Sequence, residues 1–120
     1  MDKEICFLGI IKDGEILMKV LEDSIFMGKL TYPSPIDFGL DKDDFDYEEV
    51  DYRFAIQKNS IMLDMNYKIK VCKIASKEID LDAISINKNV DEIGYIWLDV
   101  SKIHTFDLSP IALKVIDKII

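Results

Sequence analysis

The acidic side chains of residues 37–51 are the feature of this sequence with the clearest potential for chemistry. The segment contains eight acids and one base, Lys42, so it carries −7 of the chain's formal charge of −8. Carboxylates at this density can bind a divalent cation or a basic protein surface. Six of these acids are candidate binding residues: Asp41, Asp43, Asp44, Asp46, Glu48 and Glu49.

The spacing of these acids does not match a calcium-binding loop. Such a loop needs oxygen ligands at its first, third and fifth positions and a glycine at its sixth. A loop that starts at Asp41 places Phe45 at the fifth position, and one that starts at Asp44 places Glu49 at the sixth. Because runs of like charge usually extend into water, we expect a solvated acidic loop, or one that meets a basic partner, and no metal cofactor.

Three aromatic residues in or near the acidic segment are candidates for stacking on a planar ligand. They are Tyr32, Phe45 and Tyr47. The single tryptophan, Trp97, alternates with Tyr95 in an apolar run, so we expect it in the core rather than in a stacking site.

The single histidine and the two cysteines are predicted to have no catalytic role. A general base needs a neighbouring acid or nucleophile, and His104 precedes a predicted helix start without one, so we expect it on the surface. Cys6 and Cys72 each lie in an apolar, alternating run, with no further thiols or second histidine to complete a zinc site. Both are expected to be reduced core residues.

Two β-hairpins are predicted. Asp13-Gly14 separates two runs rich in Ile, Leu and Val, which is the strongest short-range hairpin signal, so we expect strands over 4–12 and 15–22. Apolar residues alternate with polar ones over 50–56 and again over 61–71. Period-two alternation predicts strands with one buried face, and these two form the second hairpin.

The remaining elements are a loop, one strand and a helix. Residues 28–39 hold two of the three prolines, which favours a loop with at most a short extended piece. The apolar run over residues 93–100 predicts a buried strand, and Ser109 before Pro110 predicts a helix start. Four apolar residues then recur at helical spacing: Ala112, Val115, Ile116 and Ile119. The expected fold class is α+β, with a mixed β-sheet, two hairpins and a C-terminal amphipathic helix.

Length and charge narrow the function further. A chain of 120 residues with 49% hydrophobic content can bury one core, so we expect a single domain over 1–120. A net charge of −8 argues against direct binding to nucleic acid or to an anionic membrane. No apolar run approaches the ~20 residues of a membrane span, and the N-terminal residues lack the features of a signal peptide. We therefore expect a cytoplasmic protein.

The end of the chain, "GYIWLDVSKIHTFDLSPIALKVIDKII", resembles the end of a Nudix domain. In that family a tryptophan-containing strand and a short link precede a Ser-Pro helix start and a terminal amphipathic helix. The segment "GKLTYPSPIDFG" is similar to the stretch that precedes the family's catalytic helix, and the opening hairpin falls in the family's order. The resemblance implies a Nudix-like domain that covers the chain except for about residues 40–60.

The motif that makes Nudix proteins hydrolases is absent. In the family, G-x5-E-x7-R-E-U-x-E-E-x-G-U, with U a bulky aliphatic residue, forms a loop and helix whose glutamates hold magnesium against a diphosphate. Here the only arginine, Arg53, is followed by Phe54, and Ser34-Pro35 stands where the family has paired glycines. The resemblance therefore implies a degenerate domain without the catalytic helix, and it assigns no catalytic residue.

Three hypotheses of function stay open. The first is a non-catalytic Nudix-like binding module for a protein or a nucleotide-like ligand. The second is a small acidic inhibitor that occupies a basic groove of a partner protein, for example a groove that binds nucleic acid. The third is a divergent Nudix-type hydrolase with relocated metal ligands, which would need magnesium. Exposed strand edges also predict pairing between copies, as in a homodimer.

Overall fold

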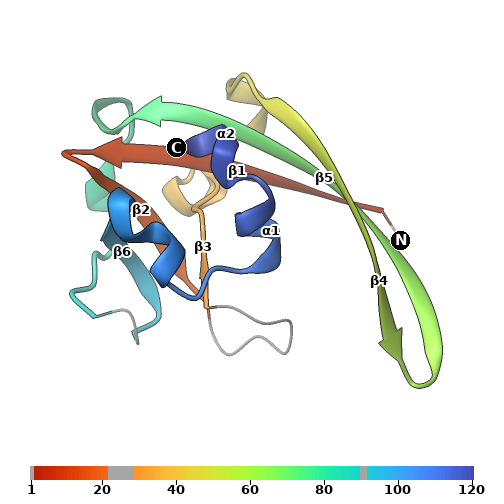
Figure 1. The fold of residues 1–120 in the computed structure, drawn as a ribbon. Coiled ribbons are helices and arrows are strands. Elements are labelled where there is room, and N and C mark those ends of the chain that lie inside the picture. Colours follow the sequence, from red (N-terminus) through yellow and green to blue (C-terminus); the bar gives the residue numbers. More distant parts are fainter. Residues whose placement is uncertain (1, 22–28, 90–91) are drawn as a thin grey trace.

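The computed structural model describes residues 2–21, 29–89 and 92–120, and its central element is a mixed β-sheet (Figure 1). The strand order is β3-β2-β1-β5-β4. In this order β1 and β3 share one edge of β2, and β6 pairs with the opposite edge. Short helices follow the last strand, so the predicted α+β class with a mixed sheet is confirmed. The strands are β1 (Asp2–Lys12), β2 (Glu15–Val20), β3 (Leu30–Thr31), β4 (Glu48–Lys58), β5 (Ile61–Ala75) and β6 (Gly94–Asp99).

Both predicted hairpins form, each around a two-residue turn. Asp13 and Gly14 connect β1 to β2 with φ of 52° and 78°. Asn59 and Ser60 connect β4 to β5 with φ of 53° and 64°. Positive φ at both central positions matches the right-handed twist of the flanking strands. The prediction that the second strand continues to residue 22 is only partly right: β2 ends at Val20, and residue 22 lies outside the described residues.

The sheet is mixed because β1 and β5 run parallel. Their pairing extends from Asp2↔Asn66 to Ile11↔Ala75. By contrast, β1 pairs with β2 only next to their turn, at Ile11↔Ile16 and Lys12↔Glu15. The other edge of β2 pairs along its whole length with β6, antiparallel. β5, which comes much later in the chain than β1 and β2, therefore lies in the middle of the sheet, between β1 and β4.

The predicted C-terminal helix is two short helices rather than one. They are α1 (Pro110–Lys114) and α2 (Ile116–Ile119), and Val115 between them has φ −110° and ψ 8°. The predicted start is confirmed, because the Ser109 hydroxyl accepts a hydrogen bond from the Ala112 amide at 3.2 Å. All four predicted stripe residues, Ala112, Val115, Ile116 and Ile119, are buried.

Each face of the sheet carries a core. The helices α1 and α2 cover one face, where α2 approaches β1 so closely that a Cβ on Gly9 would lie 2.8 Å from Ile119 Cγ2 (Figure 1). This face contains most of the buried apolar side chains. The second core lies on the opposite face, beneath the 3₁₀ turns η1 (Pro35–Phe38) and η4 (Leu81–Ala83). It is built around Leu8, Ile10, Leu17, Phe38 and Ile79.

The distal part of the β4–β5 hairpin extends beyond the rest of the sheet, as Figure 1 shows. Because β1 begins opposite Asn66, residues 61–65 of β5 have no strand on that side within the described part of the chain. We call residues 54–65 the arm. At its tip Ile61 is 60% exposed and Met62 is 63% exposed.

Candidate functional site

The acidic segment, which the sequence predicts to be a solvated loop, is exposed to solvent but only partly a loop. Its start lies in η1, its middle forms a second 3₁₀ turn, η2 (Lys42–Asp44), and its end is the beginning of β4. Asp41 caps η2, because its carboxylate accepts a hydrogen bond from the Asp43 amide at 2.9 Å. A local hydrogen bond of this kind, from a backbone amide to an Asp side chain two residues earlier, stabilises a turn even where the sequence does not favour a helix. All six candidate carboxylates are exposed: Asp41, Asp43, Asp44, Asp46, Glu48 and Glu49.

Of the predicted stacking residues, Phe45 attaches this segment to the second core and Tyr47 forms a hydrogen bond within the segment. Phe45 packs against the second core. The Tyr47 hydroxyl donates to the Lys42 carbonyl oxygen at 2.6 Å. The two rings lie 6.4 Å apart at an angle of 53°. Both side chains are half-buried, so their main visible role is to fix the backbone that carries the carboxylates.

Tyr32, the third predicted stacking residue, lies in the first core and is 1% exposed. Its hydroxyl donates to the Ala112 carbonyl oxygen at 2.8 Å, and its ring meets the edge of Phe7 at 5.3 Å. Burial raises the pKa of this phenol. Its assignment to the binding site is wrong for this conformation, because neither face of the ring is open to a ligand.

Glu48 and Glu49 point to opposite faces of β4, because side chains alternate along a strand. Glu48 lies 3.7 Å from the Lys118 ammonium, whereas Glu49 lies 3.9 Å from Lys70 and 4.0 Å from Lys68. The two carboxylates therefore cannot converge on one ion. Among the described residues, no group of three or more His, Cys, Asp or Glu side chains is arranged to hold a metal.

Lys42, the only base in the acidic segment, forms its salt bridge with Glu4 of β1 rather than with a neighbouring aspartate. Its ammonium lies 3.4 Å from Glu4, which also lies 3.4 Å from Lys70. The hydrogen bond from Lys42 lowers the pKa of Glu4, and the same bond raises the pKa of Lys42. Within the described residues, Asp43, Asp44 and Asp46 take part in no salt bridge.

Asp37 behaves differently from the acids that follow it. Its side chain is 7% exposed and lies 2.9 Å from the Lys19 ammonium. It also accepts hydrogen bonds from the Ser34 amide at 2.7 Å, from the Ser34 hydroxyl at 3.0 Å and from the Tyr95 hydroxyl. Burial disfavours the charged carboxylate, but these bonds outweigh burial and lower the pKa of Asp37.

The Asp37 contacts join η1 to β2 and β6, and they were not predicted from the sequence. The local part had a signal, since Ser34-x-x-Asp37 around Pro35 has the pattern of a helix-start capping box. Lys19 and Tyr95 are 18 and 58 positions away from Asp37, so no spacing rule connects them. We call Asp37, Ser34, Lys19 and Tyr95 the Asp37 cluster.

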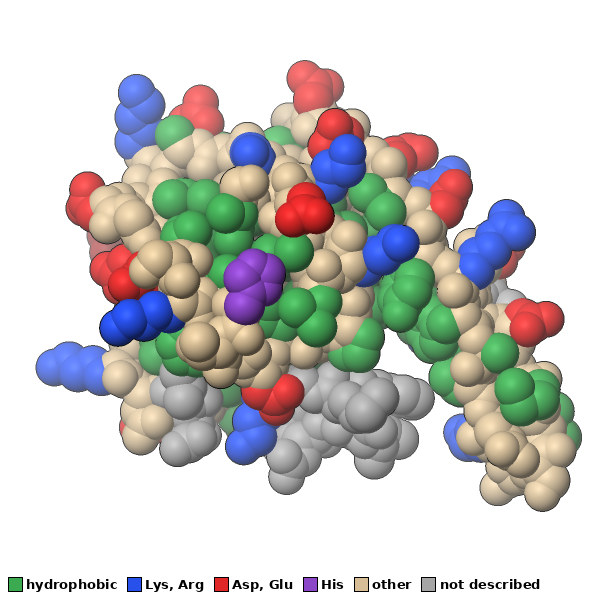
Figure 2. Space-filling view, in the orientation of Figure 1, with side chains coloured by type: hydrophobic (Ala, Val, Ile, Leu, Met, Phe, Trp, Pro, Cys, Tyr) green, Lys and Arg blue, Asp and Glu red, His purple; other side chains and the backbone are tan. Residues whose placement is uncertain are grey.

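The histidine, the tryptophan and the two cysteines lie close to where the sequence predicts. His104 is exposed, as the purple side chain in Figure 2 shows. Trp97 is half-buried and packs against the second core. Cys6 and Cys72 are free thiols, half-buried rather than fully in the core. Burial raises the pKa of both thiols, so neither is an activated nucleophile at neutral pH.

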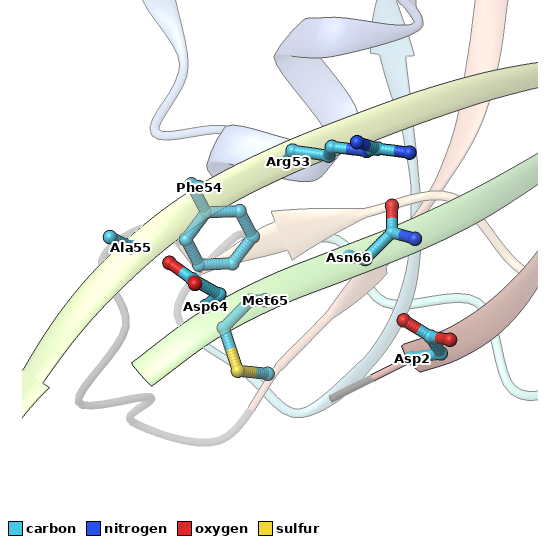
Figure 3. A pocket seen from close by; sticks show the side chains of 7 residues that line it. All are labelled: Asp2, Arg53, Phe54, Ala55, Asp64, Met65 and Asn66. Carbon is cyan, nitrogen blue, oxygen red and sulfur yellow. The ribbon is translucent and has the colours of Figure 1, made fainter. Parts of the chain in front are cut away.

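Two hollows in the described surface are poorly suited to a phosphate group. One, of about 430 Å³, borders the acidic segment and is lined by Asp46, Glu48 and Asp117 together with Lys73 and Lys118. Its carboxylates oppose an anionic ligand. The other, of about 590 Å³, lies at the base of the arm, where Asp2 and Asp64 accompany Arg53 (Figure 3). Here Asn66 carries a buried side-chain oxygen without a hydrogen-bond partner.

The comparisons with known proteins identify no family for this chain. No protein-family model matches the sequence, and no curated protein matches it. In the described residues, no helix combines the length and apolar character that a bilayer span requires.

Proposed function

We propose that this protein is a non-catalytic, Nudix-like binding module whose acidic segment binds a basic surface of a partner protein. The observation that carries the proposal is the contrast within the segment: Asp43, Asp44 and Asp46 are exposed and have no salt bridge among the described residues, while Lys42 is held by Glu4. Exposed carboxylates that form no salt bridge can pair with an external cation at little desolvation cost.

The Nudix-like part of the proposal is supported by the resemblance of the chain's end. The strand that contains Trp97 leads into the capped start at Ser109-Pro110, in the order that the family uses. The non-catalytic part is supported by the positions of Glu48 and Glu49 on opposite faces of β4. In this proposal the protein acts in the cytoplasm and needs no cofactor.

An acidic inhibitor that occupies a basic, nucleic-acid-binding groove of its partner is the specific form that the charges favour. Side chains on a fixed backbone lose less freedom on binding than those of a disordered acidic tail. The anchoring of the segment by Phe45 and Tyr47 therefore favours a partner with a defined cationic site. A nucleotide-like ligand is the less favoured alternative, because the acidic hollow repels phosphate.

The partner interaction is tested by affinity capture with two matched variants. One carries D43K, D44K and D46K, and the other carries D82K, E92K and D107K, which changes the net charge equally at exposed sites elsewhere. We expect wild type and the second variant to retain a specific, salt-sensitive partner that the first variant loses. Equal retention by both variants, or equal loss, would contradict a role for the acidic segment.

The non-catalytic assignment is tested separately with magnesium and a panel of nucleoside diphosphate compounds. We expect no turnover above that of the buffer. Turnover that disappears in the E48Q/E49Q variant would instead support the divergent hydrolase with relocated metal ligands.

A further inference from the structure

The outer edge of β4 is an unused strand edge. β4 is the last strand on its side of the sheet, and within the described residues it pairs only with β5 (Figure 1). The pairing with β5 is unbroken from Glu48↔Val71 to Lys58↔Ile61, so no bulge interrupts the edge. The strand has 11 residues and contains no proline or glycine. A long, regular edge of this kind is a template for another strand.

The turn at Asn59-Ser60 determines which backbone groups the edge offers. A two-residue hairpin loop closes on a hydrogen-bonded pair, here Lys58 and Ile61, and hydrogen-bonded pairs then alternate along the ladder. The even-numbered residues of β4 therefore bond to β5. The amides and carbonyls of odd-numbered residues, including Arg53 and Ala55, point to the outer edge.

The side chains on one face of β4 are complementary to themselves when the strand is reversed. This face begins with an acid, ends with a base and is apolar between: Glu48, Val50, Tyr52, Phe54, Ile56 and Lys58. In an antiparallel pair of two β4 strands centred on Arg53, Glu48 faces the second copy's Lys58. Val50 then faces Ile56, and Tyr52 faces Phe54. Opposite charges and aromatic pairs directly across strands are stabilising.

This complementarity selects one register. Strands can slip only in steps that keep the same side chains on the same face. Centring the pair on Tyr52 places Glu48 against Ile56, and centring it on Phe54 places Val50 against Lys58. On the other face of the chosen register, Arg53 meets its own copy, and Asp51 of the second copy lies diagonally next to it. That aspartate offsets part of the repulsion between the two guanidinium groups.

We propose that two copies of this chain associate by antiparallel pairing of their β4 edges, with Arg53 of each copy at the two-fold axis. The second copy is favoured as the occupant because β4 supplies both halves of the charge and apolar pattern. Lys58 is available for the intermolecular pair because it has no salt bridge among the described residues. This inference is independent of the proposed partner-binding function.

Blocking the backbone edge is the first test, with sedimentation velocity over a range of concentrations as the measurement. In A55P the proline removes an amide that points outward and leaves the ladder to β5 intact. We expect wild type and the A55S control to be dimers and A55P to dissociate with a Kd at least about tenfold higher. Circular dichroism is the check that A55P is folded, and we expect its spectrum to match that of wild type.

Reversing the charge pair tests the register. K58E places two acids opposite one another at both ends of the pair and should raise the dimer Kd roughly tenfold. The double variant E48K/K58E restores opposite charges and should recover the wild-type Kd. Because Glu48 also lies near Lys118 of its own chain, recovery in the double variant is the decisive readout.

A cysteine pair provides a measurement that does not depend on affinity. In R53C the two new thiols face one another across the axis, at a Cα separation of about 5.5 Å that a disulfide can bridge. In the A55C control the two thiols are not opposite one another, because residue 55 of each strand faces residue 51 of the other. We expect oxidation to link R53C into dimers and to leave A55C unlinked.

Three results would overturn the proposal. They are a wild type that stays monomeric at every concentration, a dimer that A55P and K58E leave unchanged, and equal cross-linking of R53C and A55C. The variants distinguish the dimer from partner binding: A55P and K58E alter the β4 edge, whereas D43K, D44K and D46K alter the acidic segment.

Discussion

Asp37 and Asp43 belong to the same acidic segment but lie in opposite environments. Asp37 is 7% exposed at its side chain and accepts bonds from three other residues. Asp43 is exposed and forms no salt bridge with any described residue. The difference comes from topology, because η1 is packed against β2 and β6, while η2 lies outside them. One carboxylate therefore bonds to three residues of the fold, and its neighbours stay exposed to solvent.

Removing the Asp37 carboxylate should have the largest effect on stability. D37A leaves the Lys19 ammonium and the Tyr95 hydroxyl without their acceptor and removes the bonds to Ser34. Loss of the shared acceptor in such a partly buried network costs about 1–3 kcal/mol. Urea denaturation of wild type and D37A at neutral pH measures the difference. A loss similar to that of D43A would contradict the assigned role.

The pH dependence of stability should separate Asp37 from the exposed acids. Its folded-state pKa lies below the unfolded value of about 3.9. Its contribution is therefore complete above the unfolded pKa and is lost as pH falls through the folded pKa. We expect the stability difference between wild type and D37N to be constant from pH 7 to 5 and to shrink below about pH 4. A difference that grows on acidification would contradict this.

Removing one donor from the Asp37 cluster should have an intermediate effect. Y95F deletes the hydroxyl that donates to Asp37 and keeps the ring that packs on the second core. A hydrogen bond to a charged acceptor contributes about 1–2 kcal/mol. The matched control is Y47F, whose hydroxyl donates to an exposed carbonyl, and we expect a smaller loss there. Thermal unfolding of both variants makes the comparison.

Neutralising the exposed acids should change stability least. In D43N/D44N/D46N no salt bridge with a described residue is broken. Surface substitutions of this kind stay within about 0.5 kcal/mol. The same variant should still lose the partner that wild type captures. A marked loss of stability here would show that the segment is structural, which removes the contrast with Asp37.

Local features of the fold were predictable from the sequence. The turn at Asp13-Gly14 and the capped start at Ser109 depend on residues that are adjacent in the chain, and both form as expected. The break at Val115 was not predictable, because an uninterrupted apolar stripe also fits two short helices that share one buried face. Burial and packing decide between these outcomes, and neither is visible in a local pattern.

Of the candidate site, only the exposure of its charged residues could be predicted from the sequence. The exposure of Asp43, Asp44 and Asp46 follows from their density, but the burial of Tyr32 depends on contacts with Phe7 and Ala112 that are distant in sequence. The partners of Asp37 come from β2 and β6 in the same way. Long-range pairing determines which member of an acidic run is enclosed, and a single sequence carries no direct record of it.

The parallel pairing of β1 with β5 affects how the chain can fold during synthesis. Asp2 cannot meet Asn66, nor Ile11 meet Ala75, until residues 66–75 have left the ribosome. Leu8 and Ile10 of β1, fully enclosed in the finished protein, stay in contact with solvent or with a chaperone until then. Both hairpins have local contacts, so each can form before β1 and β5 pair.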